Sequence, residues 1–507
     1  MGMKKHRNGH RNILMICIVG LVLPMVFGAL YVESYISKTP EIAAFNAAQQ
    51  RVNIASKPID ADRFIKTNHG SIAVNNNTKQ LGGGVLYTKE MLLTNGDTVI
   101  SGSVQGNCRT DSSVFTAKIK DDATMHLHVG DQYTVEPIHE GIYNASLIFI
   151  DSAELDAAIY TPKQYRYIEY DSLEYIPEND GYLQVVKTEK GYELDLMTVA
   201  VEDGCCSDYL LTTSRDDLLD WKEEDPDKAW INYSLDNHSR MTFTGYYMLS
   251  EPAYIPYGDK IFYRCQACYI GERFTREDMA NRAAQNFLAS IVDTMTLQKN
   301  RRGFYPSTCF SLWLDELYGM APPYYDTRFN SDLMEIFISY YERSGAENAL
   351  QALKDYESFY LFLMDNSSWD DGNGGVWVND YWAEDNDSTA VHTALNHQIA
   401  EMIVLYKVSQ IAQRQDWKEA ADRMLKAVEN VGMDWVKPNG EFHYMIDKEG
   451  KLSEQDYDTL TYNDMYRLQA LLQQDYGYRS EMIDRMMARK LEWMLNNGVH
   501  GYLGEEN

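Results

Sequence analysis

The chain has 507 residues, of which 45% are hydrophobic and 24% are charged, and its formal net charge is −29. This length predicts two domains with additional segments, and the hydrophobic fraction is sufficient for folded cores. The acidic balance excludes broad binding of nucleic acid or of another polyanion, because such binding needs a basic face that displaces counterions. A local cationic pocket for one carboxylate remains compatible with this charge.

The N-terminal segment predicts a membrane anchor. Residues 1–12 form a basic tail, and an uninterrupted apolar run follows at residues 13–31. A helix of that length rises about 28 Å, close to the thickness of the hydrocarbon core of a bilayer. The basic flank predicts a cytoplasmic N-terminus, a single-pass signal anchor, and export of the remaining chain to the extracellular side. A cleaved signal peptide is the alternative.

After a predicted stalk at residues 32–75, residues 76–273 read as a β domain. Stretches such as GGVLYT and SLIFI are separated by turns rich in Gly, Asn and Asp, without helical patterns between them. This spacing predicts a β-sandwich or jelly-roll-like domain. Cys205-Cys206 with the Cys265-x-x-Cys268 motif are candidate zinc ligands. Adjacent cysteines chelate poorly, however, so disulfides or buried thiols are favoured and no metal site is predicted.

Residues 274–507 change to helical periodicity, with about seven amphipathic stretches joined by loops of unequal length. Short loops that alternate with long aromatic ones predict an α/α toroid, here an incomplete (α/α)6-type barrel and the candidate catalytic domain. The chain as a whole is therefore predicted to be a multidomain α and β protein. Its toroid cavity is expected to open among the long loops.

The long loops of the helical region gather aromatic and polar side chains. Aromatic platforms with scattered acids and one arginine are typical of a carbohydrate cleft. Phosphate-binding, dinucleotide, HExxH and GxSxG motifs are absent from the sequence, so no cofactor is predicted. The candidate residues are Tyr325, Arg328, Trp377, Tyr381, Trp382, Glu384, His392, Asn396, His443, Tyr444, Tyr457 and Tyr462.

Three segments, WAEDNDSTAVHTALNHQIAEMIVLYKV, NGEFHYMID and DYDTLTYNDMYRLQALL, resemble in order and spacing the D-glucuronyl C5-epimerase family across roughly residues 365–475. The resemblance implies an isomerase that removes the C5 proton of a uronate within a polysaccharide and returns a proton to the other face of the ring. The chain departs from the family pattern at Ala383 and at His443, where the family has tyrosines.

Carried over by position, the resemblance distributes the roles in the site. Arg328 is the candidate for binding the substrate carboxylate, because a guanidinium matches a carboxylate bidentately. The candidate catalytic residues are Tyr381, Glu384, His443, Tyr444, Tyr457 and Tyr462. The other candidate substrate-binding residues are Tyr325, Trp377, Trp382, His392 and Asn396.

Three alternatives stay open. A polysaccharide lyase abstracts the same proton and needs a nearly identical site. A glycoside hydrolase needs two facing carboxylates. A non-catalytic glycan-binding protein of exopolysaccharide assembly needs neither. Catalysis requires Tyr381, His443 and Tyr462 to converge on one cavity near Arg328. The expected partners are an acidic polysaccharide and the membrane, with a homodimer left open.

Overall fold

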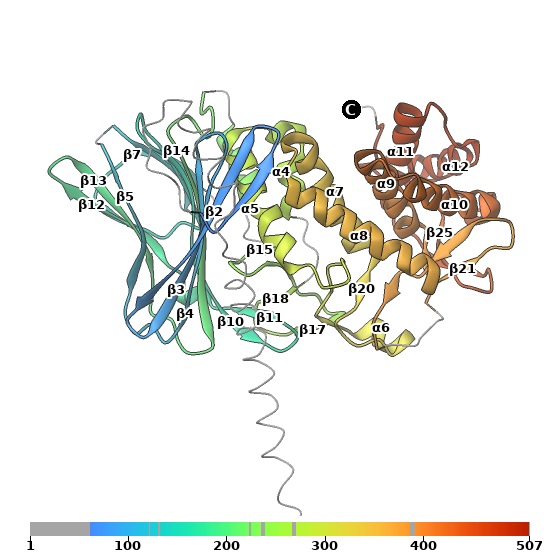
Figure 1. The fold of residues 1–507 in the computed structure, drawn as a ribbon, viewed down its shortest axis with the longest axis horizontal. Coiled ribbons are helices and arrows are strands. Elements are labelled where there is room, and N and C mark those ends of the chain that lie inside the picture. Colours follow the sequence, from blue (N-terminus) through green and yellow to red (C-terminus); the bar gives the residue numbers. More distant parts are fainter. Residues whose placement is uncertain are drawn as a thin grey trace, which may run out of the picture. The chain divides into compact units, whose positions relative to one another are not determined.

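The computed structural model describes residues 61–120, 122–129, 132–222, 225–234, 239–265, 270–385 and 391–505 (Figure 1). The chain divides into two compact units. One comprises residues 1–64 and 73–75, and the other comprises residues 65–72 and 76–507. The elements that build the candidate site belong to the second unit.

The N-terminal half of the described chain consists mainly of antiparallel sheets. The strands of the larger sheet are β1 (Arg63–Thr67), β2 (Gly70–Leu81), β3 (Gly84–Leu92), β4 (Thr98–Gly106), β6 (Thr124–Val129), β7 (Gln132–Pro137), β9 (Leu147–Asp151), β10 (Asp156–Ile168), β11 (Ser172–Tyr175), β14 (Cys205–Ser214), β15 (Ser239–Met241), β16 (Tyr246–Leu249) and β18 (Phe262–Cys265). They run in the order β1-β2-β3-β4-β14-β10-β11-β18-β16-β15, and β9 also pairs with β10 and joins β6 and β7 to the sheet.

A second sheet contains β5 (Ser112–Ile119), β13 (Gly191–Thr198), β12 (Tyr182–Thr188) and β8 (Gly141–Tyr143), in that order. Alternation decides which face is buried: in β13, Leu194 and Leu196 are buried, whereas Glu193 and Asp195 are partly exposed. The leucines enter one apolar core with residues of the larger sheet such as Ile159 of β10. The two sheets are therefore held together by alternate residues of facing strands.

Three helices accompany the sheets, namely α3 (Pro226–Tyr233), α4 (Ile270–Thr275) and α5 (Arg282–Gln298). Helix α5 packs on β4 and β14. A buried ion pair reinforces this packing, because Lys89 Nζ of β3 lies 3.0 Å from Asp293 Oδ2 of α5. Asn286 Nδ2 of the same helix donates to Asp97 Oδ2 at 2.8 Å. Buried polar groups are thus satisfied between sheet and helix.

The C-terminal half is mainly helical. Its helices are α6 (Leu312–Tyr318), α7 (Thr327–Ser344), α8 (Glu347–Asn366), α9 (Leu395–Ala412), α10 (Gln415–Val431), α11 (Leu460–Leu471) and α12 (Glu481–Asn497), with short helical turns at Gly432–Trp435 and Leu472–Tyr476. Two further short turns lie earlier in the chain, at Pro177–Asn179 between β11 and β12 and at Glu277–Met279 between α4 and α5. Helix α9 contacts α7 and α11, and these three inner helices are backed by α8, α10 and α12 (Figure 1). Helix α9 is apolar around most of its circumference because neighbours cover it on several sides.

Short strands lie in the long segments before and between these helices. They are β17 (Tyr254–Ile255), β19 (Phe310–Ser311), β20 (Tyr325–Asp326), β21 (Ser368–Asp370), β22 (Val376–Val378), β23 (Tyr381–Trp382), β24 (Thr393–Ala394), β25 (His443–Ile446) and β26 (Leu452–Gln455). Strand β20 pairs with β23, and β24 pairs with β25. The loops are therefore fixed by backbone hydrogen bonds at the ends of the inner helices.

The predicted fold class needs correction. The sheets are antiparallel and open, and the larger one has thirteen strands, which is broader than the predicted sandwich or jelly roll. The predicted (α/α)6-type toroid is present only in part, because the described helices α7 to α12 form three packed pairs rather than six. Helix α3 interrupts the region predicted to be β, and strands β20 to β26 interrupt the region predicted to be helical. These strands β20 to β26 lie in the loops between the helices.

The predicted single-pass membrane protein is also corrected. Within the described residues, no helix combines the length and the apolar character needed to cross a bilayer. The predicted basic tail 1–12, the predicted anchor 13–31 and most of the predicted stalk 32–75 lie outside the described residues. The predicted domain boundaries at residues 76 and 273 stay predictions.

The cysteines of the described region do not form a metal cluster. Cys108, Cys205, Cys206 and Cys309 are buried free thiols. No group of three or more His, Cys, Asp or Glu side chains in the described part of the chain is arranged to hold a metal ion. Cys268 lies outside the described residues.

Two carboxyl groups meet in the core of the helical region. Glu357 of α8 and Glu401 of α9 are fully buried. Glu401 Oε2 accepts hydrogen bonds from Ser331 Oγ at 2.6 Å and from Tyr356 OH at 2.7 Å. Burial raises the pKa of both carboxyls, and the neighbouring Glu401 raises that of Glu357 further. Both groups are therefore held protonated at pH values where a solvated glutamate is ionised.

We expect Glu357→Gln to stabilise the protein at alkaline pH. The pKa of Glu357 is raised above its ordinary value of 4.5, so its folded form binds a proton that the unfolded chain releases, and stability falls as pH rises above that value. A neutral amide removes this penalty. Melting temperatures measured at about pH 5 and about pH 8 should show a variant a few degrees more stable at the higher pH. The exposed Glu419→Gln is the control, and an equal gain at both pH values would contradict the expectation.

Candidate functional site

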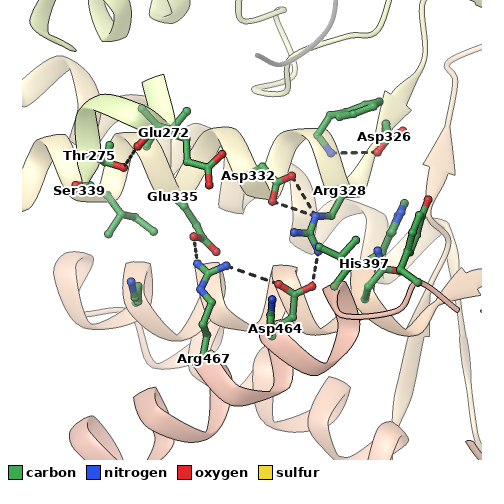
Figure 2. A pocket seen from close by; sticks show the side chains of 18 of the residues that line it. Glu272, Thr275, Asp326, Arg328, Asp332, Glu335, Ser339, His397, Asp464 and Arg467 are labelled. Atoms are coloured by element: carbon green, nitrogen blue, oxygen red, sulfur yellow. Dashed lines mark hydrogen bonds and ion pairs between the residues drawn. The ribbon is translucent and has the colours of Figure 1, made fainter. Parts of the chain in front are cut away.

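A cavity of about 860 Å³ opens among α7, α9 and α11 and the short strands at their ends (Figure 2). Its size suits a small-molecule or oligosaccharide ligand. The walls combine tyrosines with many charged groups. The lining includes Tyr254, Tyr381, Tyr444, Tyr457, Glu272, Asp326, Asp332, Glu335, Glu342, Asp464, Arg276, Arg328, Lys407, Arg467, Asn396 and His397.

A ladder of ion pairs crosses one wall from α7 to α11 (Figure 2). Arg328 of α7 lies with its Nε 3.0 Å from Asp332 Oδ1, and its Nη1 donates to Asp464 Oδ2 of α11. Arg467 of α11 pairs with Glu335 and, at 3.6 Å, with Asp464. Spacings of three and four residues place these partners on one face of each helix. The ladder therefore joins helices α7 and α11 along this wall of the cavity.

The charge on Arg328 is stabilised by its partners. Burial lowers the pKa of its guanidinium, but Asp332 and Asp464 raise it by more, so the net pKa is raised. For Asp464, burial outweighs the effect of Arg328 and raises the carboxyl pKa to about 6. The guanidinium of Arg328 thus forms ion pairs with two carboxyl groups of the protein, Asp332 and Asp464.

A carboxyl group with an unusual pKa stands at the start of α7. Asp326 is the N-cap residue of this helix, and its Oδ1 accepts a hydrogen bond from Phe329 N at 3.1 Å. Strand pairing between β20 and β23 sets Asp326 opposite Tyr381. Burial raises the pKa of Asp326 to about 7, in spite of the backbone hydrogen bonds that lower it. Asp326 can therefore accept or donate a proton near neutral pH.

A neutral imidazole shares the cavity with Asp326. His397 lies in the first turn of α9, and its Nδ1 is 3.3 Å from Asp380 Oδ2. Asp380 is held in turn by Ala394 N, which donates to the same oxygen at 2.8 Å. The ring of His397 meets that of Tyr381 edge-on, with centroids 6.0 Å apart. Burial lowers the pKa of His397 to about 4 although Asp380 raises it, so the ring is uncharged at neutral pH.

Asp380 lies next to two imidazoles. Nδ1 of His397 is close to this carboxylate but makes no hydrogen bond with the described residues. His392 approaches the same Asp380 oxygen, with its Nε2 at 3.3 Å, and its Nδ1 is bonded to the hydroxyl of Tyr318. Of the two imidazoles beside this buried carboxylate, His397 is the one that lines the cavity.

The structure brings together part of the residue set proposed from the sequence. Tyr381, Tyr444, Tyr457, Arg328 and Asn396 line the cavity. Tyr381 comes from β23, Tyr444 from β25, and Tyr457 from the segment just before α11. Three tyrosines from separate loops therefore share one wall.

Three other proposed catalytic residues lie away from that wall. Glu384 is exposed and paired with Arg301 and Arg302. His443 is half-buried in β25 and is not among the lining residues. Tyr462 is buried with its ring against Tyr502. Tyr381, His443 and Tyr462 consequently do not converge on one cavity.

The remaining proposed binding residues serve packing. Tyr325 is fully buried, and its hydroxyl lies 2.8 Å from that of Tyr356. Trp377 packs against Trp435, with ring centroids 5.7 Å apart. Trp382 packs on Phe359 at 5.7 Å. His392 lies behind the wall, as described above.

Asp326, Asp380 and His397 were missed as site residues. A local signal existed for Asp326, because it directly precedes a helix and an acid there is a typical N-cap. His397 lies five positions after His392, a spacing that does not place two ligands on one helix face. In the structure, however, His392 precedes the helix, so the helical spacing argument did not apply.

No family model and no curated protein sequence matches this chain. Among solved structures, the chain is similar to a D-mannose isomerase, with 11% identity and a TM-score of 0.33 over 45% of this chain and 59% of that one. It is similar to cellobiose 2-epimerase from Bacillus thermoamylovorans B4167, with 12% identity and a TM-score of 0.35 over 46% and 60%.

A third similar structure is the family 76 glycoside hydrolase (mannosidase) Bt3792 from Bacteroides thetaiotaomicron VPI-5482, with 13% identity and a TM-score of 0.32 over 45% of this chain and 57% of that one. The chain therefore spans less than two thirds of the length of these three proteins. All three process sugars, and none of the three is a glucuronyl C5-epimerase. Likeness at such TM-scores does not assign an activity to this chain.

We expect the imidazole of His397 to stay neutral down to about pH 5. Its pKa of about 4 results from burial, and Asp380 is the group that raises it. Asp380→Asn should therefore lower the pKa further. Long-range ¹H–¹⁵N spectra of histidine-labelled protein, assigned with His397→Gln, measure this directly. Titration of His397 near the ordinary value of 6.5 would contradict the described environment.

Proposed function

We propose that this chain is a carbohydrate-modifying enzyme that moves a proton at a sugar carbon, in the isomerase or epimerase class. The observation that carries the proposal is that Asp326 and His397 line the same cavity in different protonation environments. A carboxyl that titrates near neutral pH and a neutral imidazole beside Asp380 form an acid–base pair. Tyr381, Tyr444 and Tyr457 supply aromatic surface for a sugar ring.

The chemistry follows from these groups. Nε2 of His397 removes a proton from a carbon next to a carbonyl or carboxyl group, and the electron pair moves onto that oxygen as an enol or enolate forms. Asp326, in its protonated form, supplies a proton to the intermediate. Burial raises the pKa of Tyr381 well above its ordinary value, so its hydroxyl stays protonated and can donate a hydrogen bond to the developing oxyanion. Return of the proton to the opposite face gives an epimer, and return to the neighbouring carbon gives an isomer.

A uronate C5-epimerase is the specific form that the resemblance of residues 365–475 suggests. The shared wall of Tyr381, Tyr444 and Tyr457 beside Arg328 supports this form. The form also needs a cation for the substrate carboxylate, and Arg328 is already bonded to Asp332 and Asp464. The proposal is therefore the broader one, an enzyme that transfers protons on a sugar.

Deuterium exchange tests this function. The protein is incubated in D₂O with neutral glycans of glucose and mannose and with glucuronate- and mannuronate-containing polysaccharides, and the products are followed by NMR. Deuterium at a sugar carbon without chain cleavage is the expected result. A new double bond would show a lyase, and a new reducing end would show a hydrolase. Glycan binding without exchange or cleavage would show the non-catalytic alternative.

We expect Asp326→Asn to abolish most of the exchange while the fold is retained. Asparagine caps a helix about as well as aspartate, so the hydrogen bond from Phe329 N survives and the melting temperature should change little. The amide cannot transfer the proton, and the rate should fall by a factor of roughly 10² to 10⁴. Rates and melting curves of the two proteins measure both effects. An unchanged rate would remove Asp326 from the mechanism.

A further inference from the structure

We infer that the sugar unit held between Asp326 and His397 is uncharged, and that Asp332 and Asp464 determine this specificity by occupying Arg328. This inference rests on the proposed function and names the substrate class of the same site. Arg328 lies at the same end of the cavity as Asp326 and His397 (Figure 2).

Arg328 is held on two sides. Its Nε lies 3.0 Å from Asp332 Oδ1 and donates to Asp332 Oδ2 at 3.1 Å, while its Nη1 donates to Asp464. A uronate that took the Nε or Nη1 of this guanidinium would have to displace a carboxylate that is already in place and, for Asp464, buried. Such an exchange takes the nearer partner from Asp464, which keeps Arg467 at 3.6 Å, and this is costly in a buried site.

The other cations of the wall do not replace Arg328. Arg467 is bonded to Glu335 and Asp464, and Arg276 is bonded to Asp278 and Asn232. Lys407 follows His397 on α9 at a rise of roughly 15 Å along the helix. A carboxylate on a sugar at the acid–base end is therefore out of reach of Lys407.

The balance of charge points the same way. The wall carries six carboxyl groups, namely Glu272, Asp326, Asp332, Glu335, Glu342 and Asp464, against four lysines and arginines, and Asp326 with its pKa of about 7 is only partly charged at neutral pH. His397 adds no charge at neutral pH because burial lowers its pKa to about 4. The net negative charge of the wall repels an anionic sugar that enters this cavity, whereas it does not repel an uncharged sugar.

Unsatisfied acceptors identify what the cavity offers to a ligand. Asn396 is 1% exposed and lines the cavity, and its Oδ1 has no hydrogen-bond partner within the described part of the chain. Oε1 of Glu335 is a second acceptor of the wall without a partner among the described residues. Both atoms require donors. The C6 hydroxyl of a neutral sugar is a donor, whereas the C6 carboxylate of a uronate is an acceptor only, so the two sugars differ in this respect at C6.

Matched ligands test the inference. The probes are two pairs of disaccharides that differ only at C6: a β-1,4-linked glucose disaccharide with its glucuronate-terminated counterpart, and the corresponding mannose and mannuronate pair. Isothermal titration calorimetry should show the neutral member of at least one pair binding about tenfold tighter or more. Equal or tighter binding of the uronate members would overturn the inference and leave the proposed function intact. Binding of neither member of either pair would remove the proposed function, and the inference with it.

A variant tests the role given to Asp332. Asp332→Asn releases the Nε side of Arg328, so the ratio of uronate affinity to neutral-sugar affinity should rise by about tenfold. Glu342→Gln is the matched control, since it removes one negative charge from the same wall without touching Arg328. Melting curves confirm that both variants fold. A similar rise in both variants would show that net charge alone sets the ratio, and no rise in Asp332→Asn would exclude the guanidinium as the determinant.

Discussion

The ion pair between Arg328 of α7 and Asp464 of α11 is the contact on which the cavity depends. These residues lie far apart in the sequence, and the ion pairs between them join α7 to α11 along one wall of the cavity (Figure 2). Asp332 and Arg467 extend the pair along each helix, so neither buried charge is left without a partner. Removing one partner from such a buried network is costly, because it leaves another buried charge without its partner.

The same constraint shapes the chemistry. An arginine that is held by two carboxylates fixes the position of α7, and with it the position of Asp326 at the N-terminus of that helix. Burial then raises the pKa of Asp326 to about 7 and lowers that of His397 to about 4. A buried, charged wall therefore underlies both the acid–base pair and the exclusion of an anionic sugar that we propose.

The short strands do the remaining positioning. Pairing of β20 with β23 sets Asp326 opposite Tyr381, and pairing of β24 with β25 places Tyr444 beside the start of α9. Each pairing joins a loop to another loop of distant sequence position. Sequence periodicity predicted the helices on either side but not the two-residue strands β20, β23 and β24, because two residues are too few for a period to be visible.

By itself, the sequence predicted a change from strand patterns to helical patterns and loops rich in aromatic residues, and both predictions follow from local rules of alternation, helical period and turn composition. The family resemblance named Tyr381, Tyr444, Tyr457 and Arg328 as candidates, and these four line one cavity in the structure. Only the tertiary structure decided that Arg328 is bonded to two carboxylates, that His443 and Tyr462 are not among the residues lining the cavity, and that Asp326 and His397 both line it. The physical reason is that charge pairing, burial and pKa depend on neighbours brought from distant parts of the chain, and no local pattern records those neighbours.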